Sequence, residues 1–120
     1  MFLHLNHKKL AVYHSSSELV IYCYKIAGTL PPEERFGLIS QIKRAAVSVV
    51  LNLAEGASRR SPAERRRFFE IARGSLIEID AALDIANELG YLKNQELNSL
   101  GQCIIKTFKL LSGLINPGSG

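Results

Sequence analysis

The sequence predicts an all-α protein, an antiparallel up-down four-helix bundle, on three observations. Apolar residues make up 47% of the 120 residues, but Trp is absent and there are only five Phe and four Tyr, so the core must come mostly from Leu, Ile, Val and Ala. Apolar side chains recur at three- and four-residue steps, and no stretch alternates as a strand does. Three breaks with Gly or Pro, at residues 29–34, 56–62 and 89–94, separate four such stretches, and short connections favour antiparallel neighbours.

The chain is long enough for one domain with a single core and too short for two. We predict one domain over residues 1–120, with helices at about 8–28, 33–57, 62–89 and 95–114 and a flexible tail at 116–120. Pro31 and Pro32 end the first helix. The apolar stripe of the first helix is Val12, Leu19, Cys23, Ile26 and Leu30, and that of the fourth is Leu97, Leu100, Ile104, Phe108, Leu111 and Ile115.

The third helix has the clearest signals for its start and its end. Ser61 is placed to accept from the backbone N–H of Glu64, and the Glu64 side chain to return to the N–H of Ser61, which predicts a capping box. Pro62 then occupies the first helical position, where its missing N–H costs nothing. Gly90 predicts a left-handed residue that ends the helix.

The second helix is more apolar than a bundle helix needs to be. Eight of the ten residues in AAVSVVLNLA, positions 45–54, are apolar, whereas an ordinary bundle helix exposes about half of its circumference. We predict that Val47, Val50 and Leu51 contact another copy of the chain. Central burial within the monomer is the alternative.

The polar residues of the second helix suggest a structural network. Paired carboxylates such as Glu55 and Glu78 can in principle hold a metal or act as acid and base. No histidine is near either in sequence, and Arg44 offers a counter-charge, so we favour an ion-pair and hydrogen-bond network over a metal site or an active site. Its predicted members are Arg44, Asn52, Glu55 and Glu78, with Ser48 on the same stripe.

The net charge of the chain is concentrated around the break between the second and third helices. Six arginines against two glutamates give residues 59–73 a charge of +4, which equals the formal net charge of the whole chain. Successive helical residues point about 100° apart, so neighbouring arginines cannot share one buried face. The six candidates for nucleic-acid contact are Arg59, Arg60, Arg65, Arg66, Arg67 and Arg73.

Three interpretations of these arginines remain open. Guanidinium groups suit phosphate oxygens and predict sequence-tolerant binding of RNA or DNA. Pairing with acids of a neighbouring subunit, such as Asp80, Asp84 and Glu88, is a second interpretation, and a plain solvated face is a third. Helical spacing also predicts local ion pairs that join Glu70 to Arg66 and to Arg73. No RNA-reading pattern of exposed stacking aromatics is present, since Phe68 and Phe69 occupy core-like positions.

Other classes of site and location find little support in the sequence. Cys23 and Cys103 lie far apart and predict buried, reduced thiols, and the three histidines, all within the first fourteen residues, predict surface side chains without a metal. There is no phosphate-binding loop, nucleophile motif or catalytic triad, so we expect no enzyme activity and no cofactor. No window approaches the ~18 apolar residues of a membrane span, and no signal peptide is evident. We expect a cytoplasmic protein without a membrane partner.

Several motifs together resemble the 23S rRNA intervening-sequence protein family. They are FGLISQIKRAAVS at 36–48, NLAEG at 52–56, RRS at 59–61, FEIARGSLIE at 69–78 and LGY at 89–91. The resemblance covers nearly the whole chain, and the motifs are specific in combination. One departure is Leu51, where members often have a proline, so the second helix should be straighter here.

The resemblance implies an antiparallel four-helix bundle that assembles as a homopentameric ring. Many members are encoded within insertions in large ribosomal RNA genes. A distant relative, the accessory variability protein of diversity-generating retroelements, is a basic pentamer that binds nucleic acid and a reverse transcriptase. The family has no agreed catalytic residues. The main hypothesis is thus a non-catalytic oligomer that binds RNA or DNA, and the alternative is an oligomeric scaffold for a protein partner such as a reverse transcriptase.

Overall fold

A computed structural model describes residues 1–117 of the chain, and the part that it describes contains helices and no strands. Four α-helices account for most of it, and two short 3-10 helices precede the first two of them. In chain order the elements are η1 (Asn6–Lys9), α1 (Ala11–Ala27), η2 (Pro32–Glu34), α2 (Leu38–Ser58), α3 (Pro62–Glu88) and α4 (Asn98–Ile115). The predicted all-α class with four helices is confirmed.

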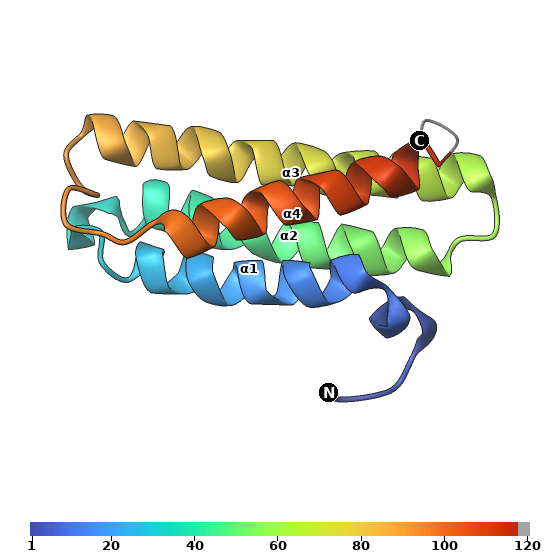
Figure 1. The fold of residues 1–120 in the computed structure, drawn as a ribbon. Helices are drawn as coiled ribbons and strands as arrows, with labels where there is room; N and C mark the ends of the chain where they lie inside the picture. Colours follow the sequence, from blue (N-terminus) through green and yellow to red (C-terminus); the bar gives the residue numbers. More distant parts are fainter. Residues whose placement is uncertain (118–120) are drawn as a thin grey trace.

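The four α-helices lie side by side along one long direction (Figure 1). Neighbouring helices are α1 and α2, α2 and α3, α3 and α4, and α4 and α1, whereas no Cα atoms of the diagonal pairs lie within 8 Å of each other in residues 1–117. The turn between α2 and α3 lies at one end of the bundle, and the connections from α1 to α2 and from α3 to α4 lie at the other (Figure 1). The N-terminal segment leaves the bundle at the end that carries the α2–α3 turn.

The core lies between the four helices and is mostly aliphatic. All five residues of the predicted stripe of the first helix are buried, whereas Phe108 of the α4 stripe is exposed over about a third of its surface, at 38%. Fully buried large side chains come from every helix: Leu19, Ile42, Leu53, Leu76, Ile79 and Leu111.

Three helices begin later than the sequence predicts. The segment before α1 forms η1, so α1 starts at Ala11 and not at Lys8. Before α2 the chain forms the separate 3-10 turn η2, and Gly37 then leaves the helical region with φ −110° and ψ −112°, so α2 starts at Leu38. α4 starts at Asn98, whose N–H donates to the Glu96 carboxylate at 2.7 Å.

The signals at the two ends of α3 are observed in the structure. Ser61 Oγ accepts from the Glu64 N–H at 3.4 Å, although no return bond from Ser61 to the Glu64 carboxylate forms in the described chain. Gly90 has φ +80°, and the Tyr91 N–H donates to the Ala86 carbonyl at 3.0 Å, which completes a left-handed helix end.

The tail predicted to be flexible falls partly outside the described residues. Asn116 and Pro117 follow α4 and are exposed, and residues 118–120 lie outside the part of the chain that the structure describes.

Candidate nucleic-acid interface

Five of the six candidate arginines gather at the end of the bundle where α2 turns into α3. Arg59 and Arg60 lie in the turn, and the other three occupy the first turns of α3. Of the five, only Arg59 is half-buried, and the rest are exposed. We call Arg59, Arg60, Arg65, Arg66 and Arg67 the arginine cluster.

Arg59 ties the cluster to α2 and α3. Its guanidinium forms an ion pair with the Glu55 carboxylate, one helical turn earlier in the chain. The same guanidinium lies over the Phe68 ring, 5.0 Å from the ring centroid. Arg65 in turn donates its Nε–H to the Arg59 carbonyl oxygen at 2.6 Å. The turn is therefore held from both sides, and Phe68 lies half-buried beneath a guanidinium and not in the core.

Arg73 lies apart from the cluster, further along α3. It is half-buried, and its NH1 donates to Ser112 Oγ on α4 at 3.1 Å. Its guanidinium also lies over the Phe108 ring, 5.6 Å from the centroid. These contacts give Arg73 a role in joining α3 to α4.

The charge of the cluster is almost uncompensated within one molecule. Arg59 and Glu55 form the only ion pair in residues 1–117, so the predicted pairs of Glu70 with Arg66 and with Arg73 do not form. Helical spacing allows those pairs, but exposed long side chains gain little from making them. The N-terminus of α3, with its positive dipole end, adds to the positive potential of the four unpaired arginines.

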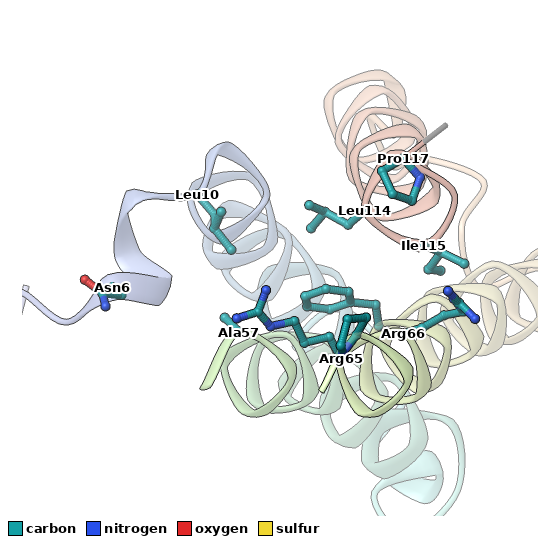
Figure 2. A pocket seen from close by; sticks show the side chains of 10 residues that line it. Asn6, Leu10, Ala57, Arg65, Arg66, Leu114, Ile115 and Pro117 are labelled. Atoms are coloured by element: carbon teal, nitrogen blue, oxygen red, sulfur yellow. The ribbon is translucent and has the colours of Figure 1, made fainter. Parts of the chain in front are cut away.

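A groove of about 520 Å³ opens at the same end of the bundle. Its walls are largely apolar and come from the ends of all four helices. Figure 2 shows Arg65 reaching from α3 toward Ala57 and Leu10, whereas Arg66 reaches toward Ile115. Nothing in the sequence pattern marks this groove, because its lining residues are scattered along the chain. It places two guanidinium groups beside an apolar surface.

The predicted polar network is divided in the structure. Asn52 Nδ2 donates to the carbonyl and hydroxyl oxygens of Ser48 at 2.9 and 3.0 Å, and Ser48 Oγ lies 2.8 Å from Ser75 Oγ on α3. Glu55 pairs with Arg59. Arg44 and Glu78 are exposed and form no hydrogen bond or ion pair with any described residue. The pairing of Ser48 with Ser75 joins two helices and was not predicted.

The predicted contact residues of helix α2 remain accessible in the single chain. Leu51 is 63% exposed, and Val47 and Val50 are half-buried. The apolar run therefore divides between core residues such as Val49 and Leu53 and these outward residues. The self-association predicted from them stays a prediction.

Cys23 and Cys103 are free and buried, and burial, with a smaller contribution from Cys103, raises the pKa of the Cys23 thiol to about 12. No group of three or more His, Cys, Asp or Glu that could hold a metal ion occurs in the described part of the chain. None of the helices in residues 1–117 is long and apolar enough to cross a membrane.

Comparison with known proteins gives one result that bears on this site. None of the curated proteins matches the chain. The family model described as 23S rRNA-intervening sequence protein matches residues 8–113, a range that contains all four α-helices except the last residues of α4 and the whole arginine cluster. The chain belongs to the 23S rRNA-intervening sequence protein family.

Proposed function

We propose that this chain is a non-catalytic protein that binds RNA or DNA through the arginine cluster. The observation that carries the proposal is that Arg60, Arg65, Arg66 and Arg67 are exposed and form no ion pair within residues 1–117. Exposed charges of one sign that crowd one end of a molecule repel each other, and an anionic partner relieves that repulsion. The name of the family, which refers to a ribosomal RNA insertion, favours RNA as that partner.

The binding we propose is electrostatic and nearly independent of nucleotide sequence. Guanidinium groups match phosphate oxygens with two parallel hydrogen bonds, and each phosphate contact releases a counterion. The cluster contains no pair of exposed aromatic rings on which bases could stack, because Phe68 lies under Arg59 and Phe69 is buried.

The functional form that we propose is a cytoplasmic homopentameric ring of antiparallel bundles. The exposed Leu51 and its neighbours on α2 support self-association, and the family resemblance supports five copies in the ring. A ring repeats the arginine cluster once per subunit, which multiplies phosphate contacts without any new residue.

Fluorescence-anisotropy titration of labelled RNA and DNA of mixed sequence tests this function. We expect log affinity to fall linearly with log salt, with a slope of about −0.9 per duplex phosphate contacted and about −0.7 per single-strand phosphate. No binding of either nucleic acid even at about 50 mM salt would contradict the proposal. That outcome would favour the alternative of a scaffold for a protein partner.

A further inference from the structure

Two shallow grooves lie away from the arginine cluster, on opposite sides of the bundle. The first, groove A, runs over α2 beside α1 and is lined by Tyr24, Lys43, Arg44, Val47 and Leu51, among others. The second, groove B, lies between α3 and α4 and is lined by Ile77, Asp80, Ile105, Phe108 and Lys109, among others. In the described chain α1 and α3, and likewise α2 and α4, are diagonal pairs with no Cα atoms within 8 Å of each other, so the α1–α2 side faces away from the α3–α4 side.

Both grooves expose large apolar side chains to solvent. Leu51 in groove A is 63% exposed, and Ile77 and Ile105 in groove B are 54% and 56% exposed. Scattered single apolar residues on a surface are normal, but contiguous ones that line a depression and have charged residues at the rim mark an interaction site. Each groove therefore lacks a covering partner in the single chain.

The charges around the two grooves are complementary. Groove A carries Lys43 and Arg44 and no acid, and Arg44 has no hydrogen bond or ion pair with a described residue. Beside groove B, Asp80, Asp84 and Glu88 follow one another at single-turn spacing on α3. Asp80 and Lys109 line groove B itself, and Asp84 and Glu88 continue the acidic row along α3 beyond that lining. None of the three acids forms an ion pair in residues 1–117. A basic, apolar groove and a row of acids beside an apolar groove thus occur on the same chain.

We propose that groove A of one copy docks onto groove B of a second copy, with Arg44 facing Asp80 and Asp84. This inference rests on the self-association proposed above and names the two surfaces that make it. Leu51 and Tyr24 would then cover Ile77, Ile105 and Phe108, which removes apolar surface from water on both sides. In this contact the acids of α3 pair with Arg44 and Lys43 of the neighbouring copy, so the arginine cluster stays free to bind phosphate.

The contact joins two different surfaces, so it is head-to-tail. Such a contact gives every copy one neighbour on each side, and the copies form a ring when the rotation closes and an open chain when it does not. A two-fold symmetric contact would instead pair one groove with itself. The two arrangements respond differently to charge reversal.

Charge reversal at one groove at a time tests the docking. Arg44→Glu and Asp80→Arg each place like charges together, and we expect each variant to associate about tenfold or more weakly than the wild type. The double variant Arg44→Glu/Asp80→Arg restores opposite charges at every contact and should recover the wild-type mass. A mixture of the two single variants restores opposite charges only where unlike copies meet, which a ring of five cannot achieve at every contact, so the mixture should associate more strongly than either single variant alone. Light scattering after size exclusion measures the mass, and circular dichroism checks that each variant is folded. Lys93→Glu and Glu18→Arg, which lie outside both grooves, are the matched controls.

Each outcome decides between the proposals. A monomeric wild type at micromolar concentration would contradict self-association itself, and the docking with it. A wild type that associates, with singles that keep its mass, would contradict only the docking of groove A onto groove B. Weakening by Arg44→Glu but not by Asp80→Arg would indicate a two-fold contact through groove A. Loss in both singles without recovery in the double variant would show that the two side chains do not face each other.

Discussion

Arg65 donates its Nε–H to the Arg59 carbonyl oxygen at 2.6 Å, and so joins the first turn of α3 to the first residue after α2. Arg59 itself is held by Glu55 and by the Phe68 ring. One end of the arginine cluster is therefore structurally fixed, whereas Arg66 and Arg67 extend from α3 without such a bond. Positively charged groups that are already ordered lose less conformational entropy when they bind an anion.

We predict that Arg65→Lys destabilises the protein by about 1 kcal/mol, because lysine keeps the charge but has no Nε–H in the position that reaches the Arg59 carbonyl. Arg67→Lys is the matched control, since no described residue accepts a hydrogen bond from Arg67, and it should be neutral. Urea denaturation monitored by circular dichroism gives both free energies of unfolding. Equal midpoints for the two variants would show that the Arg65 bond contributes nothing to stability.

Ser61→Ala should cost about 1 kcal/mol, because it removes the side-chain oxygen that accepts from the Glu64 N–H at the start of α3. Ser99, an exposed serine in the first turn of α4 with no side-chain hydrogen bond in the described chain, provides the control Ser99→Ala. Chemical denaturation of both variants measures the difference. A midpoint for Ser61→Ala that equals the wild type would mean that water caps α3 equally well.

Substitution of glycine by alanine should have opposite effects at Gly56 and Gly74. A Cβ at Gly56 would lie 2.8 Å from Phe69 Cε1, whereas a Cβ at Gly74 would meet nothing within 4 Å. We expect Gly56→Ala to destabilise by roughly 1–3 kcal/mol through overpacking, and Gly74→Ala to stabilise by up to about 1 kcal/mol through its higher helix propensity. Thermal unfolding of both variants shows whether each substitution lowers or raises the stability of the protein. A stabilising Gly56→Ala would show that α2 and α3 separate at little cost.

The raised pKa of Cys23 predicts a loss of stability at alkaline pH. The thiol ionises near pH 8.5–9 in the unfolded chain and at about 12 in the folded one, so the unfolded state releases its proton first as the pH rises. The free energy of unfolding should fall between about pH 9 and 12, by up to about 1.4 kcal/mol per pH unit from this group. Urea titrations at pH 8 and 10 measure the fall. In Cys23→Ala the free energy of unfolding should fall less between pH 8 and pH 10 than in the wild type. An equal fall would mean that other groups cause the effect.

The local signals in the sequence were sufficient for much of the fold. The first-helix stripe, the Ser61 cap and the left-handed Gly90 depend on neighbours within a few residues, and each is observed in the structure. The late start of α2 was missed, because the helical periodicity continues through η2 although Gly37 does not adopt helical angles.

The candidate site could be predicted only in part. The position of the arginines in the chain indicated where they would gather, and the spacing of Glu55 and Arg59 was compatible with their ion pair. The guanidinium of Arg59 over Phe68, the bond of Arg73 to Ser112 and the two surface grooves depend on how separate helices approach each other. How the helices approach each other depends on the packing of the whole bundle, so the residue pattern of one helix does not reveal it.

The salt dependence of nucleic-acid affinity in an arginine variant tests whether the arginine cluster contacts phosphate. The variant Arg65→Ala/Arg66→Ala/Arg67→Ala removes three charges of the arginine cluster, and Lys25→Ala/Lys93→Ala/Lys106→Ala removes three exposed charges elsewhere. Fluorescence anisotropy at several salt concentrations, beside light scattering, compares both with the wild type. We predict that the arginine variant keeps the oligomeric mass but binds nucleic acid more weakly and with a flatter log–log slope, while the lysine variant keeps most of the wild-type affinity and slope. An arginine variant that binds with the wild-type affinity and slope would contradict the assignment of these residues to phosphate contact.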